Sequence, residues 1–255
     1  MPTQITDWPH VLTAAILVLV RVSGLIVFAP LFSSAAIPPR IKAGFVIAIT
    51  ALLAPAVGVL PQSHAELSMS AILGELAVGL TFGFALTLLT ESLLFAGQLI
   101  GMEFSFSLVN LLDPNSNIQT PVLGQLLNWL GLLVVIGAGL DRSLLAAVMR
   151  SFAVVPVGQA VMKANTCAAL ADMTGGILLA GLQLAAPVMA AAMTVEVVVG
   201  LVARISPQLP AMVVGIPLKT LVSYGVLIGS LAMWPAWIER HFTSLLDHAQ
   251  RLVAS

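Results

Sequence analysis

Long stretches without a charged side chain dominate this sequence and restrict it to few folds. Residues 43–60, 122–140, 173–195 and 220–238 contain no Asp, Glu, Lys or Arg, and residues 11–31 contain only Arg21. A helix needs about 20 apolar residues to cross the roughly 30 Å hydrocarbon core of a bilayer. Helices satisfy their own backbone hydrogen bonds in lipid, whereas irregular chain does not. The sequence therefore predicts an all-α, polytopic membrane protein of about six long, partly broken helices in hairpins.

Composition excludes several other classes of protein. Charged residues make up 8% of the chain, against about 25% of an ordinary soluble domain, and hydrophobic residues make up 59%. A single Tyr and a 6% aromatic share disfavour an outer-membrane barrel, which carries aromatic girdles. The net charge of -1 offers no basic surface to nucleic acid. Cys167 is the only cysteine, which excludes an intrachain disulfide and a thiolate metal cluster.

Six charged residues interrupt the apolar segments, namely Arg21, Glu75, Glu91, Glu196, Arg204 and Lys219. An arginine at the middle of a spanning helix costs about 2.5–3.5 kcal/mol on insertion scales, so Arg21 should face protein rather than lipid. The basic and acidic members are equal in number, which favours buried ion pairs. The candidate partners of Arg21 are Glu75, Glu91 and Glu196. The alternative is a proton or ion relay, because charges inside a bilayer commonly serve transport.

Residues 66–98 form one helical pattern that would be about 50 Å long at 1.5 Å per residue. This length exceeds the apolar thickness of a bilayer. The helix should therefore tilt and break near Gly79 and Gly83, or extend beyond the membrane into other protein. Residues 143–162 are a marginal span split by Pro156 and should pack against the other helices. Residues 239–255 are expected to form an amphipathic polar tail. Residues 1–10 carry Asp7 and no Lys or Arg, so no cleavable signal peptide is expected.

Residues 96–121 join a strongly apolar half to a polar, turn-forming half. Gly97 and Gly101 allow close approach of backbones, and Asp113-Pro114 ends any preceding helix. The bulky apolar residues of this stretch are Met102, Phe104, Phe106, Leu108, Leu111 and Leu112. An exposed patch of such residues marks an interaction site, so the apolar half needs a partner surface, a lipid face or a cavity to close.

No enzyme signature is supported by its sequence context. His64-Ala65-Glu66 lacks the second histidine of a zinc-protease helix, and Gly137-Ala138-Gly139 lacks the third glycine and the preceding strand of a dinucleotide site. A phosphate-binding GxxxxGK[ST] loop and a GxSxG nucleophile elbow are both missing from the sequence. We therefore expect no catalytic residue, no metal site and no cofactor.

Three sequence blocks, in a fixed order, carry a resemblance to a known family. They are Arg21-Val22-Ser23-Gly24-Leu25 with Pro30 and the Ile37-Pro38-Pro39-Arg40-Ile41-Lys42 turn; Ala96-Gly97-Gln98-Leu99-Ile100-Gly101 with Asp113-Pro114, Gln119 and Pro121; and Ile205-Ser206-Pro207-Gln208-Leu209 with Gly215-Ile216-Pro217-Leu218-Lys219. On these blocks, and over nearly its whole length, the chain resembles the family of flagellar biosynthetic protein FliR, the R/T subunits of type III secretion export gates.

The resemblance implies a place in a right-handed helical assembly of P, Q and R subunits in the bacterial inner membrane, within the flagellar basal body. Residues 1–172 would form a P-like helical hairpin region, and residues 173–255 a Q-like hairpin with the C-terminal tail. The implied partners are the P and Q subunits, the large export-gate subunit, the B-type subunit, unfolded flagellar export substrates and membrane lipid. Nucleic acid is not an expected partner.

The resemblance further implies that residues 102–119 form a loop that plugs the export channel. Met102, Phe104, Phe106, Leu108, Leu111 and Leu112 would fill a narrow lumen and swing aside for cargo, and Gly97, Gly101, Asp113 and Pro114 would be hinge or packing points. Two alternatives stay open at this stage. The apolar residues could simply pack between helices. The chain could also be an ion-coupled secondary transporter using its midplane charges, although it lacks the inverted repeat typical of such proteins.

Overall fold

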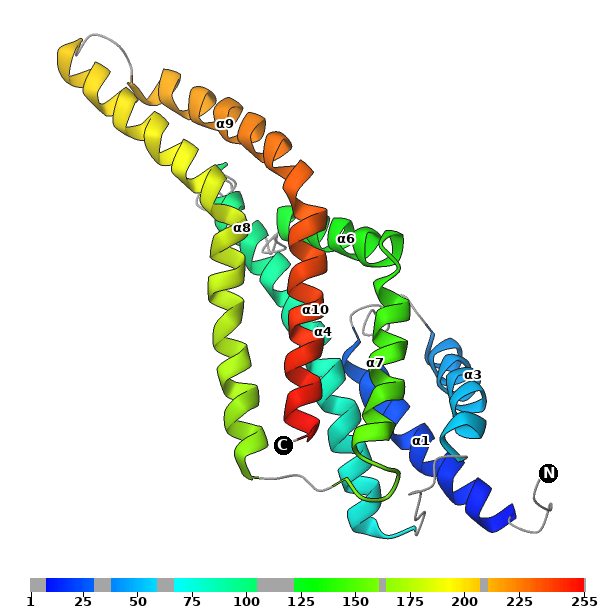
Figure 1. Ribbon diagram of the computed structural model, residues 1–255. Helices are drawn as coiled ribbons and strands as arrows, with labels where there is room; N and C mark the ends of the chain where they lie inside the picture. Colours follow the sequence, from blue (N-terminus) through cyan, green and yellow to red (C-terminus); the bar gives the residue numbers. More distant parts are fainter. Residues whose placement is uncertain are drawn as a thin grey trace, which may run out of the picture. The chain divides into compact units, whose positions relative to one another are not determined.

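Helices account for all the regular secondary structure in the part of the chain that the computed structural model describes, which is residues 8–29, 38–58, 67–104, 122–160, 164–206 and 211–254. The helices are α1 (Trp8–Phe28), α3 (Pro39–Gly58), α4 (Met69–Glu103), α6 (Val122–Gly137), α7 (Leu140–Val154), α8 (Ala164–Ile205), α9 (Ala211–Ser230), the 3-10 helix η1 (Leu231–Met233) and α10 (Trp234–Ala254) (Figure 1).

Five helical segments among the described residues are long and apolar enough to cross a membrane. A sixth span is present if α6 and α7 are counted together, although they are bent by 70° at the break between them. The predicted class, an all-α polytopic membrane protein with about six long and partly broken helices, is confirmed.

The chain divides into two compact units, which are described separately below. The first comprises Met1–Leu89, Gly139–Thr174 and His241–Ser255, and the second comprises Thr90–Ala138 and Gly175–Arg240. The long helices α4, α8 and α10 each contribute residues to both units. The division expected from sequence, between residues 172 and 173, falls inside α8 and stays a prediction.

Glycines allow α1 and α4 to pack backbone against backbone in the first unit. A Cβ atom on Gly79 would lie 2.0 Å from the carbonyl oxygen of Arg21, and one on Gly83 would lie 2.6 Å from the carbonyl oxygen of Leu25. No larger residue fits at such distances, as in other small-residue helix contacts. The helix α4 is continuous through both glycines, so the break considered near them is not present.

The helix α4 is the core helix of the chain and is longer than the sequence indicated. It has 35 residues and is therefore about 52 Å long. In its most apolar 18-residue stretch, 61% of the residues are buried, against 17% in the corresponding stretch of α3. It continues past Gln98, the expected end, as far as Glu103. The first two residues of the predicted plug segment, 102 and 103, are therefore helical.

The C-terminal residues, expected to be an amphipathic tail, form α10. Phe242, Leu246 and Ala249 recur at the spacing of one helix face and are buried. The Gln250 side-chain amide donates to the carbonyl oxygen of Ala147 on α7 at 3.5 Å, within the first unit. The helix α7 ends at Val154, because the residue before a proline, here Val155 before Pro156, is extended.

Candidate functional site

Phe104 is the last described residue before the remainder of the predicted plug segment, and it is held by α9. Its backbone N–H donates to the carbonyl oxygen of Ile100 at 3.2 Å, which continues the last turn of α4. Its ring is only 5% exposed and stacks on the ring of Tyr224, with centroids 4.1 Å apart and planes 13° apart. Phe104, one of the predicted plug side chains, is therefore packed within the second unit.

Lys219 of α9 lies between two carboxylates in the same unit. Its Nζ atom is 2.7 Å from Oε2 of Glu103 at the end of α4, and it also forms an ion pair with Glu196 of α8. The side chains of Lys219 and Glu103 are 15% and 18% exposed, whereas that of Glu196 is 58% exposed. One ammonium group thus joins three helices. Sequence reasoning considered Lys219 and Glu196 as pairing groups but missed Glu103.

The helix that follows the segment, α6, packs on α4 through two glycines. A Cβ atom on Gly97 would lie 2.2 Å from the Cα atom of Gly124. Farther along α6, a Cβ atom on Gly131 would lie 2.3 Å from Cδ1 of Leu93. By contrast, a Cβ atom on Gly101 would have no described atom within 4 Å beyond its own helix. Of the two glycines expected to be hinge or packing points, Gly97 packs against a neighbouring helix, whereas Gly101 has no such neighbour among the described residues.

The other predicted plug residues divide into two groups. Met102 lies on the last turn of α4 and is 57% exposed. Phe106, Leu108, Leu111 and Leu112, together with the hinge residues Asp113 and Pro114, lie outside the described residues. Their role as plug and hinge therefore stays a prediction.

Arg21 is the centre of a second polar site, which lies in the first unit. Its Nε atom donates to Oε2 of Glu75 at 2.6 Å, Nη1 donates to the hydroxyl of Ser151 at 3.0 Å, and Nη2 donates to the carbonyl oxygen of Val155 at 3.1 Å. The guanidinium carbon lies 4.0 Å from the centroid of the Phe152 ring. Because the side chains of Arg21 and Glu75 are 1% and 0% exposed, this pair is removed from both water and lipid.

Glu75 is satisfied on its other side as well. Its Oε1 atom accepts the backbone N–H of Gly158 at 2.9 Å, and Gly158 has the positive φ of 84° that favours glycine. A buried ion pair is tolerated when hydrogen bonds satisfy the remaining donors and acceptors, as they do here. Glu75 is one of the three partners considered for Arg21. The other charged candidates, Glu91 on α4 and Arg204 in the last turn of α8, are exposed.

A comparison with known families decides where this chain belongs. The sequence profile of the bacterial export proteins, family 1, matches residues 12–245, which is nearly the whole chain. The chain belongs to this family. The resemblance indicated by the three sequence blocks is thereby confirmed, and Arg21, Glu75, Lys219 and Tyr224 all lie within the matched region.

Several flagellar biosynthetic proteins are similar to this chain. The flagellar biosynthetic protein FliR of Caulobacter vibrioides is 32% identical over 239 residues, which cover 91% of this chain and 94% of that protein. FliR of Escherichia coli is 27% identical, with 90% of this chain and 88% of that protein covered. FliR of Bacillus subtilis is 28% identical, with 94% and 95% covered.

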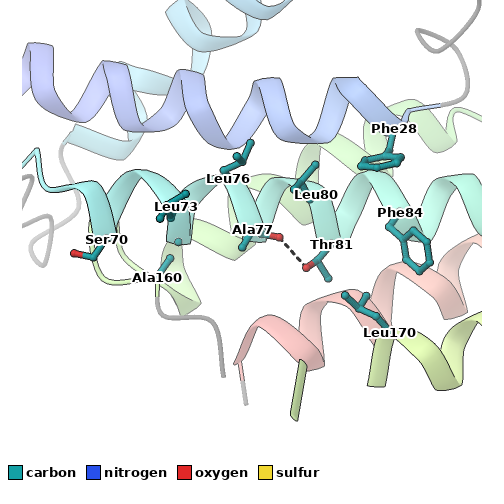
Figure 2. Close-up of a pocket in the computed structure, with 11 residues that line it drawn as sticks. Phe28, Ser70, Leu73, Leu76, Ala77, Leu80, Thr81, Phe84, Ala160 and Leu170 are labelled. Carbon is teal, nitrogen blue, oxygen red and sulfur yellow. Dashed lines mark hydrogen bonds between the residues drawn. The ribbon is translucent and has the colours of Figure 1, made fainter. Parts of the chain in front are cut away.

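This bacterial export protein also has an apolar groove of about 670 Å³ along α4 in its first unit (Figure 2). Phe28, Leu80 and Phe84 are among the side chains that line it, and no ionisable group does. The hydroxyl of Thr81 in its lining donates to the carbonyl oxygen of Ala77 at 2.9 Å. The groove therefore suits an apolar group and offers no acid or base. Among the described residues, no three His, Cys, Asp or Glu side chains gather at metal-binding spacing.

Sequence reasoning missed several residues of these sites, among them Glu103, Ser151, Gly158 and Tyr224. Ser151 and its neighbour Arg150 are the polar residues in the otherwise apolar last two turns of α7, and Tyr224 is the only tyrosine of the chain. These signals mark Ser151 and Tyr224 as unusual, because buried hydroxyls need hydrogen-bond partners and tyrosine is amphipathic. They do not identify the partner, which depends on how the helices pack.

Proposed function

We propose that this chain is the R subunit of a flagellar type III protein export gate in the bacterial inner membrane. In this role it closes an assembly of P and Q subunits and plugs the channel through which unfolded flagellar subunits pass. Two findings support the proposal. The chain is a bacterial export protein over residues 12–245, and relatives that share about 90% of its length are named flagellar biosynthetic proteins. We expect contacts with the large export-gate subunit and the B-type subunit in the same assembly, and no enzymatic activity.

The observation that carries the plug is the anchoring of the chain on both sides of residues 105–121. On the N-terminal side, Phe104 is stacked on Tyr224. On the C-terminal side, α6 packs on α4 where Gly97 meets Gly124. Anchored ends would confine any movement to the segment itself, which contains Phe106, Leu108, Leu111 and Leu112. A constriction formed by such side chains blocks water and ions by dewetting, and it needs no charged group to do so.

The outer faces of the spans support a place among lipid and other subunits. In the most apolar 18-residue stretch, only 17% of α3 and 22% of α8 is buried, and Leu52, Ile205 and Leu221 are each more than 70% exposed. Exposed faces of such bulky apolar residues suit lipid or the apolar surface of another subunit. If sister subunits cover these faces in the assembly, the isolated chain exposes apolar surface that is normally buried. This is expected of one subunit of a larger assembly.

The charge network favours the gate over an ion-coupled transporter. A transport site needs a group that is free to exchange its ion or proton, and such groups usually face a water-filled cavity. Arg21 and Glu75 instead bind each other, Ser151, and two backbone groups, and both are fully buried. We therefore assign this pair to helix packing in the first unit.

Residues 106 and 108 provide the test, because they lie beyond the Phe104 anchor. Replacing Phe106 and Leu108 together by serine retains the chain length and the stack on Tyr224. The variant complex should still co-purify with the P and Q subunits and should make reconstituted vesicles permeable to small ions. A matched control replaces Asn115 and Asn117 by serine in the polar half of the same segment, and it should stay as tight as wild type. A fully assembled variant complex with wild-type permeability would refute the plug.

A further inference from the structure

We propose that Lys219 and Tyr224 of α9 form a clamp on the end of α4, and that release of this clamp opens the last turn of α4. The clamp itself is argued from described residues alone. Only the consequence of release for ion permeability rests on the function proposed above.

Two consecutive residues of α4 are each held by a different side chain of α9. Glu103 binds the ammonium group of Lys219 with an N–O distance of 2.7 Å, and Phe104 stacks on Tyr224 at a centroid distance of 4.1 Å. Because Glu103 and Phe104 are consecutive, both contacts act on the last turn of α4. Glu103 and Phe104 are 18% and 5% exposed, so water competes weakly for either contact. An ion pair and an aromatic stack together fix this turn against α9.

The second carboxylate gives the clamp a way to open. Lys219 is paired with Glu196 of α8 as well as with Glu103, and α9 packs on α8 where a Cβ atom on Gly215 would lie 3.0 Å from Cγ1 of Val199. When Glu103 leaves, the ammonium group retains Glu196 as its partner. Opening therefore does not leave the ammonium group of Lys219 without a counter-charge. Leaving a buried charge without a partner is what makes breaking a buried ion pair so unfavourable. A lysine with a single partner would lack this property.

Amide hydrogen exchange in the last turn of α4 measures the clamp directly. The Phe104 N–H is bonded to the carbonyl oxygen of Ile100, so its exchange reports local opening there. In the assembled complex, Lys219→Met and Tyr224→Leu should each raise exchange of residues 100–104 about tenfold, the factor that corresponds to about 1.4 kcal/mol. Arg204→Met is the matched control, because it also replaces a cation by methionine, but Arg204 is exposed and lies outside the clamp.

Reversing the charges provides the rescue. The triple variant Glu103→Lys, Lys219→Glu and Glu196→Lys reverses all three charges, so each contact keeps an opposite partner, and it should restore protection toward wild type. Where Lys219→Met does not assemble, Glu103→Gln tests the same contact with almost the same side-chain shape. The clamp would be overturned if exchange of residues 100–104 stayed at the wild-type rate both in an assembled Tyr224→Leu complex and in an assembled complex with either Lys219→Met or Glu103→Gln. Raised exchange with unchanged ion permeability would uphold the clamp and refute the plug, so the two ideas fail separately.

Discussion

Arg21 on α1 and Glu75 on α4 form a fully buried ion pair with a nitrogen–oxygen distance of 2.6 Å. Ser151 of α7 and the backbone of Val155 and Gly158 complete the site, so the pair joins three helices and one turn of the first unit. An arginine in the middle of a span is tolerated because every charged group near it has a partner. This arrangement makes the first unit sensitive to the loss of any one member.

Removing the acidic partner should be the most destabilising change in this network. Glu75→Gln leaves the Arg21 guanidinium buried without a counter-charge, so we expect the free energy of unfolding to fall by about 3–5 kcal/mol. Denaturation of the purified protein in detergent measures the difference. Glu91→Gln is the matched control on the same helix, and because Glu91 is exposed it should change stability by less than about 0.5 kcal/mol. Equal stability of the two variants would show that Arg21 does not depend on Glu75.

Ser151→Ala should have a smaller effect on the same site. The change removes the oxygen that accepts from Nη1 of Arg21 at 3.0 Å and leaves a buried donor unsatisfied, which costs about 1–3 kcal/mol. Ser143→Ala, an exposed position on the same helix, should be close to neutral in the same denaturation experiment. An additive double variant Ser151→Ala with Arg21→Met would contradict the contact, because removing one partner should abolish the effect of removing the other.

The glycines of α4 near the predicted plug should differ sharply in their tolerance of alanine. At Gly97 an added Cβ atom would lie 2.2 Å from Gly124, so the helices α4 and α6 must separate, and we expect a loss of about 1–3 kcal/mol or more. At Gly101 the added atom meets no described neighbour outside its own helix, so alanine should stabilise α4 by about 0.5–1 kcal/mol. Thermal denaturation of the Gly97→Ala and Gly101→Ala variants, compared with wild type, measures both changes in stability. A destabilised Gly101→Ala would mean that another part of the chain or a partner covers that position.

The length and polarity of the apolar runs were sufficient to predict the helical class and the number of spans. The same reasoning predicted that Arg21 would need an acidic partner. The free-energy cost of placing an arginine side chain in lipid is high in any fold, so the prediction did not require knowledge of the helix packing. It left three glutamates as candidates, since periodicity does not reveal which helix faces which. Glu103 was missed for a related reason. The sequence placed the end of the long helix at Gln98, and only the continuation of α4 brings Glu103 to Lys219.

Gly158 was missed because its role is a property of the backbone. Its φ of 84° is a left-handed conformation in which a residue with a Cβ atom is strained by about 1–2 kcal/mol. Gly158→Ala should therefore destabilise the protein by about that amount, and the shift of the turn should weaken the 2.9 Å hydrogen bond from its N–H to Glu75.

Asparagine separates backbone strain from the steric effect of an added Cβ atom. Because asparagine adopts the left-handed conformation more readily than alanine, Gly158→Asn should retain most of the wild-type stability. Gly137→Ala is the matched control, since Gly137 lies in a helix and an added Cβ atom there meets no described neighbour beyond its own helix. The free energies of unfolding of the three variants should rank Gly158→Ala lowest. If alanine and asparagine at position 158 were equally harmful, a steric clash of the added Cβ atom, and not backbone strain, would account for the requirement for glycine, because both residues retain the backbone N–H that donates to Glu75.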